Sequence, residues 1–135
     1  MKQWSVRLAV LVAILAAGAS MRAEDKPAAA VHRNVKAEEF ERLTKEPGTV
    51  VLDVRTPKEY ADGHLKDAVL IDWNRKDFVD EVKKLDKGKT YLVYCAVGGR
   101  SAKACSKLDG LDFPKVVNLE GGIGAWKRAG KPIEK

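Results

Sequence analysis

Apolar residues follow two different spacings along this chain, and the spacings predict alternating strands and helices. Short, nearly unbroken apolar runs are typical of strands buried on both faces, and they occupy residues 49–54, 68–71, 90–94 and 115–119. Between them, apolar residues recur three or four positions apart, as on one face of a helix, in residues 36–45, 77–85 and 101–111. This alternation indicates an α/β fold with a mainly parallel sheet.

Turn and capping residues predict two further short helices. Thr56 is a typical N-cap, Pro57 suits a first helical position, and Glu59 stands three residues after the cap. This pattern predicts a short helix that ends at Gly63. A pair of glycines late in the chain predicts a turn into another short helix around Trp126.

The N-terminal residues have the pattern of an export signal. Lys2 and Arg7 supply positive charge around the start of an uncharged, small-to-apolar run over residues 8–19. Ala19 and Ala23 are candidate cleavage positions. An uncleaved membrane anchor is the alternative, but the run is shorter than the roughly 20 residues that span a bilayer. We therefore predict a periplasmic or secreted mature protein.

This reading divides the chain into three parts. We predict a signal peptide over residues 1–23, a flexible linker over residues 24–34 and one domain over residues 35–135. His32 lies in the predicted linker with no partner nearby in the sequence, so we expect it to be solvated.

The composition fits a soluble globular domain. Hydrophobic residues make up 45% of the chain and charged residues 33%. The formal net charge of +6 falls to +3 without residues 1–23, because 22 basic residues then remain against 19 acidic ones. The basic residues form no dense block, so we predict no nucleic-acid partner and, after signal cleavage, no membrane partner. The mild positive excess suits an anionic substrate.

A glycine-rich loop follows the strand over residues 90–94 and begins with Cys95. Gly98 and Gly99 allow the loop to turn its N–H groups inward, and a helix N-terminus beside Arg100 favours an anionic thiolate. We predict Cys95 as a catalytic nucleophile. The predicted substrate-binding residues are those of the loop that follows it: Ala96, Val97, Gly98, Gly99, Arg100 and Ser101. An inert buried cysteine at a strand end is the alternative.

Ionisable residues near the other strand ends are predicted to be structural. In such sheets the ligand lies beyond the carboxyl ends of the strands, where Asp53 and Arg55 are also expected. We predict that these two form a supporting polar network, with Glu59 as a candidate partner of Arg55. His64 is expected to form structural hydrogen bonds, and a Cys–His dyad with Cys95 is the alternative.

The second cysteine has a different setting. Cys105 falls on the apolar face of the predicted helix, with Leu108. We predict a small core residue there. A resolving thiol is the alternative.

From Val35 to Lys135 the chain resembles a single rhodanese-like domain, of the sulfurtransferase family. Four segments match the family pattern in order: residues 52–55, residues 59–65, the loop from Cys95 to Arg100, and residues 121–126 with Gly130 and Pro132. The resemblance implies a doubly wound, mainly parallel sheet flanked by helices. The C-x4-R spacing resembles that of sulfur-transferring members, whereas related phosphatases and arsenate reductases use C-x5-R.

The resemblance also implies a persulfide mechanism that needs no metal and no organic cofactor. Cys95 would take sulfur from a small anionic donor such as thiosulfate and pass it to cyanide, a thiol or a protein acceptor. The second hypothesis is a non-enzymatic sulfur carrier or binding module, loaded by a dedicated partner. The loop interior, residues 96–99, has no charged side chain, whereas some thiosulfate-using relatives carry a basic residue there.

Overall fold

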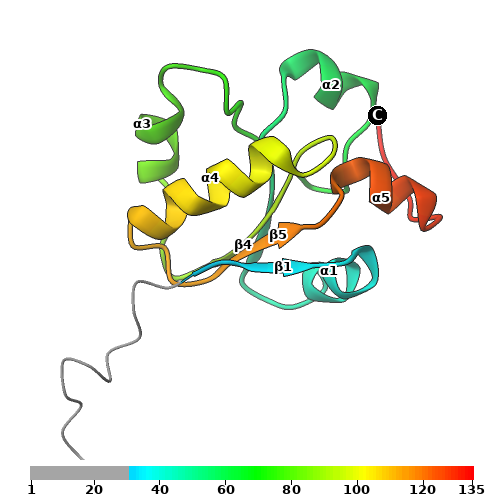
Figure 1. Cartoon of the computed structure of the whole chain (residues 1–135), viewed down its shortest axis with the longest axis horizontal. Helices are drawn as coiled ribbons and strands as arrows, with labels where there is room; N and C mark the ends of the chain where they lie inside the picture. The colour runs from blue at the N-terminus through cyan, green and yellow to red at the C-terminus, as the bar shows by residue number, and fades with distance from the viewer. Residues whose placement is uncertain (1–30) are drawn as a thin grey trace, which may run out of the picture.

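The computed structural model describes residues 31–135 as a five-stranded sheet with helices on both faces (Figure 1). The strands are β1 (Arg33–Val35), β2 (Thr49–Asp53), β3 (Val69–Leu70), β4 (Thr90–Tyr94) and β5 (Val116–Leu119). The helices are α1 (Ala37–Thr44), α2 (Pro57–Asp62), α3 (Phe78–Lys83), α4 (Gly99–Gly110) and α5 (Gly122–Arg128). The predicted α/β fold class is confirmed.

All strand pairings in the sheet are parallel, in the order β1-β5-β4-β2-β3. The central strand β4 pairs with β2 in a register that sets Asp53 opposite Tyr94. Parallel strands end at the same edge of a sheet, so the residues after β2, β4 and β5 meet there. Cys95 lies at this edge, directly after β4.

The strand β1 was not predicted, and it begins inside the segment predicted to be a linker. Arg33 and Asn34 pair with Val117 and Asn118 of β5. A three-residue strand carries too little alternation to be recognised, and the backbone groups of β5 place it. The predicted signal peptide and most of the predicted linker lie outside the described residues.

His32 also departs from its expected role. Its Nδ1 lies 2.7 Å from Oδ2 of Asp109 in α4, and its side chain is 13% exposed. The backbone N–H of His32 donates to the same oxygen. The chain just before β1 is thus attached to the C-terminal half of α4. Among residues 31–135, no helix is both long enough and apolar enough to cross a membrane.

Two apolar layers cover the two faces of the sheet. Phe40 of α1 and Trp126 of α5 pack edge to face on one side, with ring centroids 6.2 Å apart. Val82 of α3 and Leu108 of α4 are fully buried on the other side, and Figure 1 shows α3 and α4 together on that side. Burial of each such side chain stabilises the fold by about 1.5–3 kcal/mol. These layers hold the ends of the strands in fixed positions.

Candidate active site

Cys95 occupies the first position after the central strand β4, and its loop leads into α4. The residue is only 1% exposed. Gly98 adopts a φ of 110°, in the region that favours glycine, and its N–H donates to Sγ of Cys95 at 3.0 Å. Ser101, which is fully buried, donates its hydroxyl to the same sulfur at 3.3 Å. The loop thus closes around the thiol.

Hydrogen bonds decide the ionisation of this thiol. Burial alone raises the pKa of Cys95, because a charged thiolate is poorly solvated there. The Ser101 hydroxyl and the backbone N–H groups of Ser101, Gly98 and Val97 act in the opposite direction, and the net pKa lies below its ordinary value. The arrangement therefore favours a thiolate, and the same donors can stabilise other anions at this point.

The N-terminus of α5 orients the loop, a contact that the sequence analysis missed. The N–H of Ile123 donates to the carbonyl of Cys95 at 2.8 Å, and that of Gly124 donates to the carbonyl of Ala96 at 3.1 Å. A Cβ on Gly122 would lie 2.5 Å from these two carbonyl oxygens. With its first carbonyls bound by α5, the loop directs its N–H groups toward Sγ. The two glycines after β5 were the only signal of this contact.

Arg100 is paired with Glu59 rather than directed at the thiol. Its Nη1 and Nη2 lie 2.8 and 2.9 Å from the two carboxylate oxygens of Glu59. The Arg100 guanidinium, with help from Thr56, lowers the pKa of Glu59 to about 2. Thr56 and Glu59 also form the predicted capping box of α2. The suggested pairing of Glu59 with Arg55 is therefore wrong, because α2 turns Glu59 toward the cysteine loop.

Asp53 and Arg55 do contact each other, in a buried network that includes Tyr94. Arg55 Nη2 donates to Oδ2 of Asp53 and to the carbonyl of Gly63, both at 2.7 Å. The Tyr94 hydroxyl donates to the same carboxylate at 2.6 Å and accepts from the N–H of Leu65. Burial raises the pKa of Tyr94, and the Asp53 charge adds to this effect. The network joins the ends of β2 and β4 to the segment after α2.

His64 and Cys105 lie apart from the thiol chemistry. Nδ1 of His64 lies 3.1 Å from the carbonyl of Tyr60, and the two rings stack with centroids 3.9 Å apart. The structure thus gives His64 hydrogen-bonding and stacking partners outside the cysteine loop. Cys105 is fully buried among apolar residues, as predicted. Burial raises its pKa, and the charge of Asp109 adds to this effect.

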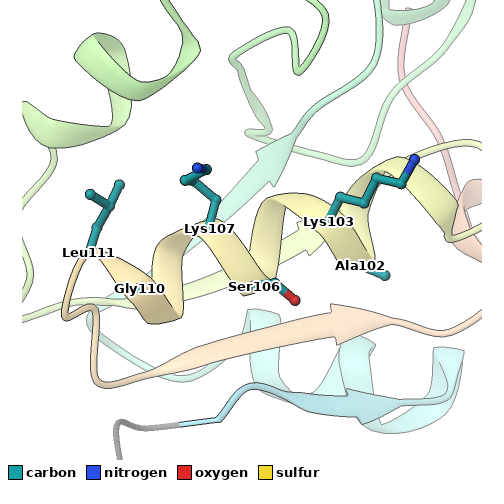
Figure 2. A pocket seen from close by; sticks show the side chains of 6 residues that line it. All are labelled: Ala102, Lys103, Ser106, Lys107, Gly110 and Leu111. Carbon is teal, nitrogen blue, oxygen red and sulfur yellow. The ribbon is translucent and has the colours of Figure 1, made fainter.

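A hollow on the described surface lies elsewhere, along α4 (Figure 2). It encloses about 550 Å³ and is lined by Ala102, Lys103, Ser106, Lys107, Gly110 and Leu111. Figure 2 shows Lys103, Lys107 and Leu111 projecting from one side of the helix. All of the lining residues belong to α4 or follow it directly, so no second helix or strand contacts a ligand bound there. The convergence of loop, α2 and α5 on Cys95 is the better candidate site.

Comparison with known proteins gives a consistent result. Residues 36–129 match the Rhodanese-like domain family. A protein named sulfurtransferase from Allochromatium vinosum is 34% identical over 93 residues, which cover 69% of this chain and 85% of that protein. A tRNA uridine(34) hydroxylase from Cytophaga hutchinsonii is 39% identical over 94 residues, but these cover only 30% of that protein against 67% of this chain.

A solved structure shares the fold as well. The rhodanese-related protein from Thermoplasma volcanium superposes with a TM-score of 0.69 at 33% identity, covering 76% of this chain and 98% of the other. The family match thus includes Cys95 and its loop, and the structural match covers 76% of this chain.

Proposed function

This chain belongs to the rhodanese-like domain family, and we propose that it is a sulfurtransferase that carries sulfane sulfur as a persulfide on Cys95. The observation that carries the proposal is the set of donors around Sγ: the Ser101 hydroxyl and the N–H groups of the loop. A nucleophilic sulfur needs such donors to exist as a thiolate, and a persulfide anion can use the same donors.

The proposed cycle has two displacement steps. The Cys95 thiolate attacks the outer sulfur of a donor such as thiosulfate, so that a new bond to Sγ forms while the S–S bond of the donor breaks. The electron pair of that bond leaves with sulfite. Cyanide, or a thiol in the cell, then attacks the outer sulfur of the persulfide and removes it, which restores the thiolate. The N–H groups and the Ser101 hydroxyl stabilise the anionic sulfur in both steps.

Mass measurement of the purified protein tests this cycle. Thiosulfate should add one sulfur atom, located on the peptide that contains Cys95, and cyanide should remove it as thiocyanate. Cys95→Ser should abolish both changes. Cys105→Ala is the matched control, and it should keep the cycle at a cost of about 1–2 kcal/mol in the free energy of unfolding.

The outcome also separates an enzyme from a carrier. Thiocyanate formed by Cys95→Ser at the parental rate would contradict the persulfide mechanism. Sulfur uptake by Cys95 without turnover would replace the enzyme with a sulfur carrier loaded by a dedicated partner.

We also propose that the domain acts outside the cytoplasm, in the periplasm or beyond. The proposal rests on Lys2, Arg7 and the apolar run over residues 8–19. N-terminal sequencing of protein from the native cell should find a first residue between Ser20 and Lys26. A mature protein that begins at Met1 and sediments with membranes would contradict it.

A further inference from the structure

The cysteine loop lacks a free cation of its own. The side chains at positions 96–99 are uncharged. Arg100, the second residue of α4, donates to both carboxylate oxygens of Glu59, so its charge is largely offset. The N–H groups of the loop stabilise an anion once it has arrived. They do not explain how an anionic donor is drawn to a loop whose neighbouring arginine, Arg100, is already paired with Glu59.

Arg128, at the end of α5, brings a second guanidinium to the loop from the other side. A Cβ built on Gly124 would lie 3.3 Å from Nη1 of Arg128, and one built on Gly121 would lie 3.8 Å from Nη2. The guanidinium thus packs over these two glycines. Both glycines touch the loop: Gly124 donates to the carbonyl of Ala96, and the N of Gly121 lies 3.4 Å from a Cβ built on Gly98.

Helix geometry explains this placement. Side chains on a helix lean toward its N-terminus, and positions 124 and 128 share one face of α5, which begins directly after Gly121. The side chain of Arg128 therefore reaches back along α5 toward the end that binds the loop. Because Gly124 has no side chain, the guanidinium can approach the helix backbone at that position.

The side chain of Arg128 is accessible to a ligand. The residue is exposed, and within residues 31–135 it forms no ion pair with a carboxylate. The other charged residues of this part of the chain are Glu120, just before Gly121, and Lys127, one position earlier on α5; both are exposed. Lys127 projects about 100° around the helix from Arg128, and it therefore serves as a matched control.

We propose that Arg128 is a specificity-determining residue, which attracts anionic sulfur donors to the cysteine loop and favours them over neutral reagents. The substrate class rests on the proposed sulfur transfer, and thiosulfate, a dianion, is the probe that fits it. The effect of Arg128 on anions at Cys95 is electrostatic and does not depend on sulfur chemistry. Arg128 is exposed, so added salt should weaken this effect.

Two alkylating reagents test the electrostatic effect directly. Iodoacetate and iodoacetamide both alkylate a thiolate and have similar sizes, but only iodoacetate is charged. The ratio of their rate constants at Cys95, measured by peptide mass at one pH, cancels the thiolate fraction. Arg128→Ala should lower the iodoacetate-to-iodoacetamide ratio about three- to tenfold at low salt. Lys127→Ala should change it less than about twofold, and Arg128→Lys should restore most of it.

Sulfur transfer gives the second measurement. Arg128→Ala should raise the KM for thiosulfate by a similar factor, while kcat changes little and high salt removes the difference. Thermal unfolding should match that of the parent, because the side chain is exposed.

The two measurements distinguish a failure of the role proposed for Arg128 from a failure of the proposed function. An unchanged alkylation ratio in Arg128→Ala would overturn the role of Arg128 whether or not the protein transfers sulfur. If Arg128→Ala lowers the alkylation ratio but Cys95 never accepts sulfur, the electrostatic role of Arg128 stands. The proposed function and its substrate class are then contradicted. A raised KM that persists at high salt would show that Arg128 shapes the loop instead of attracting the donor.

Discussion

Cys95 and Cys105 lie in the same apolar layer and are equally hidden, yet their thiols differ. Cys95 is 1% exposed and Cys105 0%. The pKa of Cys105 is raised by its burial and by Asp109, as expected for a thiol surrounded by apolar side chains. Burial acts on Cys95 in the same direction, but the net pKa of Cys95 is lowered. Exposure therefore does not account for the opposite pKa shifts of the two thiols.

The two cysteines differ in whether the backbone N–H groups near them are free to donate to the thiol. Cys105 stands inside α4, where the N–H groups are already bound to carbonyls one turn earlier. Cys95 stands before α4, where the first N–H groups of a helix have no partner within it. The Cys95 thiol accepts hydrogen bonds from this loop and from Ser101. Free donors at a helix start thus lower the pKa of one buried thiol, whereas burial raises the pKa of the other.

The largest expected effect is the difference in alkylation between the two cysteines. Iodoacetamide should modify Cys95 on the order of a thousandfold faster than Cys105 at pH 7, because hydrogen bonds lower the pKa of Cys95 while burial raises that of Cys105. The rate at Cys95 should rise with pH and reach half of its maximum at a lower pH than for an unperturbed thiol, because its pKa is lowered. Quantitative peptide mass spectrometry over a pH series measures both. Equal alkylation rates at Cys95 and Cys105 in the folded protein would contradict the difference expected between the two thiols.

A methyl group on Gly122 should make Cys95 resemble Cys105. The φ of Gly122 is 62°, and a Cβ there would lie 2.5 Å from the carbonyls of Cys95 and Ala96. Gly122→Ala should therefore destabilise the fold by about 2–4 kcal/mol and slow alkylation at Cys95 as the N–H groups lose their alignment. Denaturant unfolding and alkylation rates measure the two effects.

Gly99→Ala is the matched control for that substitution. Gly99 begins α4 at the end of the cysteine loop, but a Cβ there would have no neighbour within 4 Å, and its φ is not positive. Stability and alkylation should stay close to those of the parent. A similar loss in both variants would show that the loop tolerates no added side chain, so that the specific contact with α5 would not be the cause.

The smallest effect should come from removing one donor. Ser101→Ala deletes the hydroxyl 3.3 Å from the sulfur but leaves the backbone N–H groups in place. The pKa of Cys95 should rise, so alkylation at pH 7 should slow by roughly three- to tenfold and recover at high pH. Ser106→Ala, on the same helix and away from the thiol, should leave the profile unchanged. An unaltered profile in Ser101→Ala would assign the lowered pKa to the backbone alone.

Local patterns were sufficient to predict most elements and the position of the cysteine loop. The apolar run over residues 90–94 ends at Cys95, and the glycines that follow it indicate a turn whatever the rest of the chain does. Thr56 and Glu59 predicted the start of α2 because a capping box lies within four residues. The burial of Cys105 followed from its spacing to Leu108. In each case the interacting groups are close along the chain.

The sequence by itself therefore determined the alternation of strands and helices, the cysteine loop and the family resemblance. Only the tertiary structure decided that β1 joins β5, that Tyr94 binds Asp53, and that Glu59 pairs with Arg100 across 41 positions. It also set α5 against the carbonyls of the loop, which turns the N–H groups toward Sγ. These contacts join residues far apart in the chain, and their partners are selected by the positions that the packed sheet imposes.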